Sequence, residues 1–316
     1  MGTPAFAVPS LEALAAATSL VGVVSQPERP QGRGLVSLRS PVAERAVALG
    51  VPLICPARIR EPEVLATLGN WRPDVIVVAA YGKILPPAIL ELPPLGAINV
   101  HASLLPRHRG AAPIAAAILS GDTESGVTIM AMNEQMDAGD ILLQRALPIA
   151  PDDTTGTLSE RLAPLGALAL RETLELIRSE GVGRVPQDAA LVSYAPRLER
   201  DDGRIRWREA ATLIERKVRA FTPWPSAFTS LRGRRVKVLK ARPLPAFGSH
   251  APASGAPDAP APPTPGTVIA LDEAVRVAAG AGAVDLLVLQ MEGKRALPAA
   301  AFVAGTRLLI GDRFGD

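Results

Sequence analysis

The sequence predicts an α/β protein in two parts: a doubly wound, mostly parallel, Rossmann-like sheet, followed by a smaller C-terminal β-barrel of the OB type. Three observations support this prediction. The chain has 316 residues, more than one domain usually holds. Its first part alternates β-branched apolar runs with helical patterns, which is typical of parallel strands joined by crossover helices. Beyond about residue 204, short strands follow one another, as in a small barrel.

The first domain is expected at residues 1–180. Its strands are predicted at residues 20–24, 75–79, 97–100 and 127–132. Its helices are predicted at residues 9–17, 41–49 and 158–178, with Ser40 and either Thr154 or Thr155 as N-caps. Because ligands of such sheets bind beyond the carboxyl ends of the strands, a site is expected there.

The second domain is expected at residues 204–316, after a polar, turn-rich linker at residues 181–203. It is predicted to open with a helix at residues 210–220, and its strands are predicted at residues 235–241, 267–270, 275–278 and 284–290. Residues 246–265 consist mainly of Ala, Pro and Ser, a composition that cannot form a packed core. We therefore expect a disordered loop there.

The composition excludes several classes of protein. Hydrophobic residues make up 48% and charged residues 21%, as in a globular chain. No apolar stretch reaches the roughly 18 residues of a membrane span, and no signal peptide is evident, so we expect a cytoplasmic protein without membrane contact. Cys55 is a single cysteine and is expected to be a buried packing residue, and three scattered histidines argue against a metal site. No feature indicates oligomerisation, so a monomer is the default expectation.

The charge is distributed unevenly. The net charge is +3, yet residues 201–242 hold twelve Lys or Arg and only four Asp or Glu. A basic segment beside an acidic remainder is what a polyanion-binding module attached to a catalytic domain would show. The alternative is a solvated surface in an arginine-rich chain.

Two polar residues alternate with apolar ones at the end of a predicted strand. Side chains two positions apart share one face of a strand, so Asn99 and His101 point the same way while Ile98 and Val100 pack oppositely. A lone histidine is more often a core residue. An amide and an imidazole presented together at a strand end are a stronger candidate for an active site.

A second polar cluster follows one strand later, at residues 136–140. Gly139 indicates a tight loop that holds Asp137 near the sheet edge. Taken alone, Asp137 or Asp140 could simply cap a turn. Together with Asn99 and His101, an acid would raise the pKa of the imidazole, and the amide and imidazole could stabilise negative charge on an oxygen. That combination suits acyl transfer to an amine.

The run Asn99-Val100-His101-Ala102-Ser103-Leu104-Leu105-Pro106 resembles the Asn-x-His-x-Ser-Leu-Leu-Pro motif of folate-dependent formyltransferases. Asp137 matches the aspartate of their Asp-x-Gly motif. Further segments narrow the resemblance to the methionyl-tRNA formyltransferase family over nearly the whole chain: Gly2-Thr3-Pro4, the loop Gln26 to Gly34, residues 107–114, Gly126 to Met130 and Phe221-Thr222-Pro223-Trp224-Pro225.

The resemblance implies a catalytic group of Asn99, His101 and Asp137. Asn99 and His101 would hydrogen-bond the oxyanion formed when an amine attacks the formyl carbon, and Asp137 would orient the imidazole. The amine proton would leave through His101 or through a water beside Asp137. The implied formyl donor is 10-formyltetrahydrofolate and the implied acceptor is methionyl initiator tRNA. The implied folate site consists of Ser103, Leu104, Leu105 and Pro106, together with Tyr81 and Gly82.

The resemblance also implies tRNA contacts in both domains. The loop after Gln26 carries Arg29 and Arg33 amid Pro and Gly, and Arg33 matches the key arginine of a loop that engages the acceptor end of the tRNA. The alternative is an exposed loop whose arginines only aid solubility. In the second domain Lys217, Arg235 and Lys237 are among the candidates for phosphate contacts. Trp207, Phe221 and Trp224 are interpreted as packing residues rather than as base-stacking ones.

The sequence departs from the family at its first residues. Members begin with an apolar strand before the Gly-Thr-Pro turn, whereas here Met1 stands directly on that turn. We therefore expect the natural product to begin upstream. Three alternatives stay open: a formyltransferase acting on an amino sugar nucleotide, a hydrolase releasing formate from formyl-folate, and an RNA-binding relative whose catalytic site has decayed. The arginine loop and the basic second domain favour tRNA over the first two.

Overall fold

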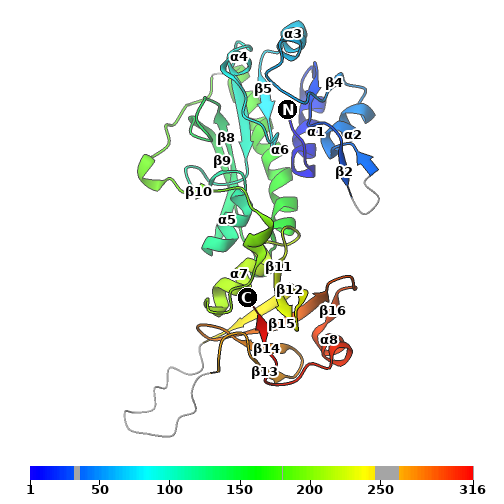
Figure 1. The fold of residues 1–316 in the computed structure, drawn as a ribbon. Coiled ribbons are helices and arrows are strands. Elements are labelled where there is room, and N and C mark those ends of the chain that lie inside the picture. Colours follow the sequence, from blue (N-terminus) through cyan, green and yellow to red (C-terminus); the bar gives the residue numbers. More distant parts are fainter. Residues whose placement is uncertain (32–35, 180, 246–262, 316) are drawn as a thin grey trace. The chain divides into compact units, whose positions relative to one another are not determined.

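The structure is a computed structural model that describes residues 1–31, 36–179, 181–245 and 263–315 (Figure 1). The chain divides into two compact units. Unit 1 comprises Met1–Ala117, Thr123–Ile149 and Thr157–Arg197, and unit 2 comprises Ile118–Asp122, Ala150–Gly156 and Leu198–Asp316. The α/β class of the first part and the curled antiparallel sheet of the second are confirmed. Most of the loop expected to be disordered, residues 246–262, lies outside the described residues.

The α/β part contains six helices and two short 3-10 turns among the described residues. The helices are α1 (Val8–Ala17), α2 (Pro41–Ala48), α3 (Pro62–Trp71), α4 (Pro87–Leu90), α5 (Pro113–Ser120) and α6 (Thr155–Ser179), and the turns are η1 (Ala5–Ala7) and η2 (Ala189–Leu191). Local sequence explains where α2 begins. The Ser40 side chain accepts a hydrogen bond from the Ala43 N–H at 3.1 Å, and Pro41 occupies the first helical position.

The sheet that carries the candidate site has the strand order β5-β6-β8-β9. These strands are β5 (Ile76–Val78), β6 (Ala97–His101), β8 (Glu124–Ala131) and β9 (Ile141–Pro148). Only β5 and β6 are parallel, whereas β8 runs antiparallel to β6 and to β9. The part predicted as a mostly parallel sheet thus contains parallel pairs together with the antiparallel strand β8. Apolar periodicity indicates a buried strand but not its direction, which depends on how α5 returns the chain.

Shorter strand pairs complete unit 1. β1 (Val23–Val24) pairs in parallel with β4 (Leu53–Ile54), β2 (Arg29–Gln31) pairs with β3 (Val36–Leu38), and β7 (Arg109–Gly110) pairs with β10 (Tyr194–Ala195). The first two residues lie between β1 and β5. The Gly2 N–H donates to the Val24 carbonyl at 3.0 Å, and the Ala79 N–H donates to the Met1 carbonyl at 2.9 Å. Through these two hydrogen bonds, Met1 and Gly2 connect the β1–β4 pair to the β5–β6 pair.

Helix α6 covers the face of the sheet opposite the candidate site. A Cβ on Gly166 of α6 would lie 2.9 Å from Val100 and 3.7 Å from Val127, so the helix packs closely on β6 and β8. Val100 and Val127 are both buried. The remaining alternate residues of β6, Asn99 and His101, therefore face the other side of the sheet. No helix in the described residues is long and apolar enough to cross a membrane.

Unit 2 is an antiparallel sheet that curls around an apolar core. Its strand order is β13-β14-β15-β12-β11-β17, with β16 paired to β15. The strands are β11 (Ala227–Leu231), β12 (Arg234–Leu244), β13 (Val268–Leu271), β14 (Val275–Ala278), β15 (Ala283–Met291), β16 (Leu297–Pro298) and β17 (Phe314–Gly315), and the helices are η3 (Arg200–Gly203), α7 (Ala211–Ala220) and α8 (Ala299–Thr306).

The curl brings the two sheet edges together. The Phe314 N–H donates to the Gly266 carbonyl and the Val268 N–H donates to the Asp312 carbonyl, both at 2.8 Å. Trp207 is 1% exposed at the centre of the core, and its ring N–H donates to the Thr229 hydroxyl at 3.0 Å. Trp207 and Phe221 are buried packing residues, as interpreted from the sequence, but that interpretation is wrong for Trp224, which is 52% exposed.

Candidate active site

His101 is the last residue of β6 and is held by its backbone neighbours. Its side chain is only 5% exposed. The ring Nε2 lies 3.1 Å from the carbonyl oxygen of His108, and Nδ1 lies 3.7 Å from Oδ2 of Asp137. A carbonyl oxygen can only accept, so Nε2 must carry a proton and donate it. Nδ1 is therefore the ring nitrogen that gains or loses a proton in this site.

Asp137 lies on the loop between β8 and β9, residues 132–140. This loop turns toward β6, so the Asp137 carboxylate lies near His101. Its Oδ2 accepts a hydrogen bond from the Gly110 N–H at 2.8 Å. Asp137 has φ of 49°, a left-handed conformation that aspartate tolerates better than most residues. Gly139 is needed for the fold of this loop, since a Cβ there would lie 1.8 Å from the Ala131 carbonyl.

The electrostatics of the site favour a neutral imidazole that is ready to take a proton. Burial lowers the pKa of His101, while the Asp137 carboxylate and the hydrogen bond to the His108 carbonyl oppose that shift. The 3.7 Å between Nδ1 and Asp137 exceeds a hydrogen-bond distance. A neutral His101 consequently presents an Nδ1 lone pair, and protonation at Nδ1 would create a cation beside a carboxylate.

Asn99 lies on the same face of β6 as His101, two residues earlier. It is partly exposed, whereas the flanking Ile98 and Val100 are buried. The pairing between β6 and β8 places Met130 opposite Asn99 and Thr128 opposite His101. The structure thus brings His101 and Asp137 into direct proximity and presents the Asn99 amide on the same side of the sheet.

Two residues that were not predicted from the sequence form hydrogen bonds with the backbone of residues 103–106, the segment expected to hold folate. Thr128, which is fully buried, donates its hydroxyl to the Ser103 carbonyl at 2.7 Å and accepts from the Leu105 N–H at 3.1 Å. Gln144 of β9 donates to the Leu105 carbonyl at 2.8 Å. Since these backbone groups already have partners, the partly exposed Leu104 and Pro106 side chains are the surface this segment offers.

Tyr81 and Gly82, the other two residues expected to contact folate, follow strand β5. The Tyr81 side chain is 2% exposed within the apolar core of unit 1, and burial raises its pKa to about 12. Its carbonyl accepts hydrogen bonds from the Thr3 hydroxyl and from the Gln26 amide, at 3.0 and 3.1 Å. A folate contact at this point would have to use the backbone near Gly82.

A strap formed by residues 187–195, within the segment predicted to be a linker, holds the loops that carry His108 and Asp137. The amide of Gln187 donates to the carbonyls of Asp137 and Gly139 at 2.9 and 2.7 Å, and its oxygen accepts from Arg109. The Ser193 hydroxyl accepts from the His108 N–H at 2.9 Å. Gly110, with φ of 124°, has its Cα so close to the strap that a Cβ would lie 2.5 Å from the Ala195 carbonyl.

Gln187 is expected to act as a positioning residue. Replacing Gln187 with leucine removes the bonds to the Asp137 loop at similar volume, and we expect kcat to fall about 10- to 100-fold because a displacement of about 1 Å has that effect. Gln187→Glu keeps an acceptor for Arg109 but loses both donors, so it should remain impaired. Gln135→Leu, an exposed residue of the same loop, is the control. Steady-state kinetics check this, and full activity in Gln187→Glu would contradict it.

The residues expected to contact tRNA lie in both units, and they differ in whether their charged groups are free to bind a phosphate. Arg33 lies outside the described residues, and Arg29 begins β2. Lys217 is engaged by Glu209, whose two carboxylate oxygens lie 2.6 Å from its amino group, so it is poorly placed for phosphate. Arg235 is exposed and stacks on Phe228, with its guanidinium carbon 3.8 Å from the ring centroid. Lys237 is half-buried on β12.

Cys55 differs from the expectation of a buried packing residue, since it is only partly buried. It directly follows the two-residue strand β4, whose own residues Leu53 and Ile54 are also only partly buried. Within the described part of the chain, no three His, Cys, Asp or Glu residues come together as a metal site would require.

Comparison with known proteins defines the class to which this fold belongs. Residues 2–174 match the family model described as formyl transferase, and residues 197–307 match that described as formyl transferase, C-terminal domain. Among solved structures, HypX from Aquifex aeolicus in complex with tetrahydrofolic acid has a TM-score of 0.59 at 19% identity, covering 93% of this chain and 49% of that one. An N-formyltransferase from Helicobacter canadensis, in complex with folinic acid and dTDP-3-aminofucose, has a TM-score of 0.63 at 18% identity, covering 92% and 97%. These likenesses establish the fold.

Curated relatives define the family more narrowly. A methionyl-tRNA formyltransferase of Roseiflexus sp. (strain RS-1) is 46% identical over 100% of this chain and 94% of its own length. One of Anaeromyxobacter sp. (strain K) is 48% identical over 97% of this chain and 96% of its own length. The chain belongs to the methionyl-tRNA formyltransferase family.

Proposed function

We propose that this chain transfers the formyl group of 10-formyltetrahydrofolate to the amino group of methionyl initiator tRNA, in the cytoplasm, for translation initiation. The observation that carries the proposal is the pair of the buried His101 and the partly exposed Asp137, on the face of the sheet that carries Asn99, in a chain of this family. The pair supplies a base and a charge partner at the point where an amine would attack an acyl carbon. No metal is needed for this chemistry.

The proposed sequence of events begins at the His101 ring. As the amino nitrogen attacks the formyl carbon, Nδ1 of His101 takes the amine proton, and the imidazolium so formed is balanced by Asp137. The Asn99 amide and the new Nδ1–H stabilise the oxyanion of the tetrahedral intermediate. When the bond between the formyl carbon and the folate nitrogen breaks, Nδ1 returns the proton to that nitrogen. The amine is then formylated, the folate nitrogen carries hydrogen, and His101 is neutral again.

The proposed substrate sites follow from the same region. Residues 103–106 are proposed to place the folate against Leu104 and Pro106, supported by Thr128 and Gln144. The loop with Arg29 and Arg33 is proposed to guide the acceptor end of the tRNA, and basic residues of unit 2, Arg235 and Lys237 among them, to add phosphate contacts. The chain is proposed to act as a monomer.

A formate-release assay separates transfer from hydrolysis. With 10-formyltetrahydrofolate alone, we expect almost no free formate. Adding methionyl initiator tRNA should give tetrahydrofolate and formylmethionyl-tRNA in equal amounts, and mass spectrometry of the formylmethionine released by mild deacylation detects the second product. Rapid formate release without an acceptor would instead establish a hydrolase, and RNA binding without either product would establish an RNA-binding relative.

Arg33 is expected to position the tRNA rather than to perform chemistry. In Arg33→Ala, kcat/KM for methionyl-tRNA should fall at least about 10-fold, while KM for the folate stays unchanged, because only the acceptor loses a contact. Arg60→Ala, which removes an exposed arginine elsewhere in unit 1, serves as the control. An unchanged kcat/KM in Arg33→Ala would count against the proposed role of the loop.

A further inference from the structure

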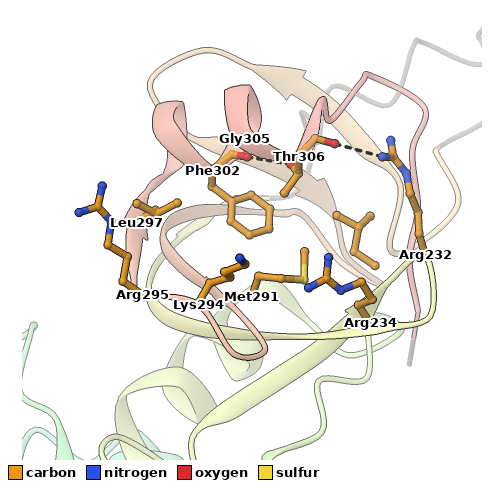
Figure 2. Close-up of a pocket in the computed structure, with 10 residues that line it drawn as sticks. Arg232, Arg234, Met291, Lys294, Arg295, Leu297, Phe302, Gly305 and Thr306 are labelled. Atoms are coloured by element: carbon orange, nitrogen blue, oxygen red, sulfur yellow. Dashed lines mark hydrogen bonds between the residues drawn. The ribbon is translucent and has the colours of Figure 1, made fainter.

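Unit 2 contains a pocket of about 610 Å³ that shares no residue with the candidate active site (Figure 2). It lies between the turn that joins β11 to β12, the turn that follows β15, and helix α8. Its apolar lining includes Met291, Leu297 and Phe302. This volume falls within the range of about 300–1,000 Å³ that small-molecule sites occupy.

Backbone pairing fixes the two turns that form walls of the pocket. Leu231 pairs with Arg234 across the first turn, and the Lys294 N–H donates to the Met291 carbonyl at 3.0 Å in the second. Phe302 of α8 is 1% exposed and anchors the helix on the core. The pocket walls therefore belong to regular, well-packed structure.

All charged residues that line the pocket are cationic. Arg232 is already engaged, because it donates to the carbonyls of Thr306 and Arg307 at the end of α8 and pairs with Asp312. Three of these cations, Arg234, Lys294 and Arg295, are exposed. None of the three forms an ion pair with another residue of the described part of the chain. None of the lining residues is acidic. Figure 2 shows the Arg234 guanidinium and the Lys294 amino group beside Met291, whereas Arg295 extends away from the centre.

We propose that this pocket binds one nucleotide of the tRNA, with a phosphate between Arg234 and Lys294 and the sugar or base against Met291 and Leu297. The assignment rests on the proposed function. Unpaired cations select an anion, and the apolar lining gives a nucleotide contacts that an inorganic ion lacks. The pocket continues the basic character of residues 201–242, so a phosphodiester chain would meet positive charge there.

Gly305 allows a test in which size and charge are varied separately. It lines the pocket from α8, and a Cβ added there would meet nothing within 4 Å. Gly305→Glu should place a negative charge at the pocket and raise the Kd for tRNA at least about 10-fold. Gly305→Lys, of similar length and opposite charge, should bind at least as well as wild type, and Gly305→Ala should be unchanged. Thermal melting of each variant shows that the fold is retained.

The salt dependence of binding measures the phosphate contact directly. In the Arg234→Ala, Lys294→Ala double variant, the slope of log K against log salt should decrease by about 1 to 2, and the Kd should rise about 10-fold. Arg206→Ala, an exposed arginine of unit 2 outside the pocket, should change the Kd less than about 2-fold.

Failure of this proposal is distinguishable from failure of the proposed function. If wild type formylates methionyl-tRNA while the pocket variants keep its Kd and salt slope, the pocket proposal is overturned and the function stands. If wild type shows no formyl transfer but the pocket variants lose RNA affinity, the proposed function is overturned and the pocket proposal stands. Polyglutamate serves as a competitor, and displacement of tRNA by polyglutamate as efficient as by unlabelled tRNA would show a general anion site and overturn the nucleotide assignment.

Discussion

Replacing His101 with alanine is expected to lower kcat about 10³- to 10⁴-fold and to leave the Kd for tRNA nearly unchanged. The ring supplies both the base for the amine proton and a donor for the oxyanion, and each such contribution is worth about 10² or more. Single-turnover kinetics with saturating folate measure the chemical step directly.

His108→Asn is the matched control for His101→Ala. It keeps the carbonyl that accepts from His101, and asparagine tolerates the φ of 60° at this position. We expect a loss of less than about 10-fold. If His101→Ala retained more than a tenth of the wild-type kcat, His101 would not be the base.

Replacing Asp137 with asparagine is expected to lower kcat/KM about 10²- to 10³-fold and to move the acid limb of the pH profile to lower pH. His101 works as a base only when neutral, so activity falls in acid as Nδ1 becomes protonated. The Asp137 carboxylate raises the pKa of His101 against the effect of burial. Removing that charge lowers the pKa further, and protonation then requires a more acidic solution.

The profile of log kcat/KM against pH, measured for both enzymes, checks the direction of this shift. Asparagine keeps the left-handed backbone of the loop and can still accept from the Gly110 N–H. Asp140→Asn removes a carboxylate from the same loop and should change neither the rate nor the profile. An acid limb that stays in place in Asp137→Asn would indicate that Asp137 only caps the loop.

The sequence was informative wherever a pattern is local. The strand with Asn99 and His101, the helix capped by Ser40 and the strand Val275–Ala278 each follow from periodicity and capping within about ten residues. The alternation along β6 also indicated which face would carry polar side chains. These features need no knowledge of distant partners.

The rest of the fold and site depends on long-range contacts. The direction of β8 follows from how α5 returns the chain, and β9 was missed because its partly buried residues include Gln144 and Arg145 and show no clear alternation. Gln187 gave no signal, since its bonds to Asp137 and Gly139 span 50 and 48 residues. Thr128 had a detectable signal, because it lies on a predicted strand at a buried position, but its partner segment could not be identified.

The choice of acceptor is the central claim, and a competition experiment measures it most directly. Wild-type protein is given labelled 10-formyltetrahydrofolate together with equal concentrations of methionyl initiator tRNA and an amino sugar nucleotide, and the label in each product is counted. We expect essentially all of the label on the methionyl amino group, with a ratio of kcat/KM values above about 10³. Label on the sugar, or on neither acceptor, would contradict the account.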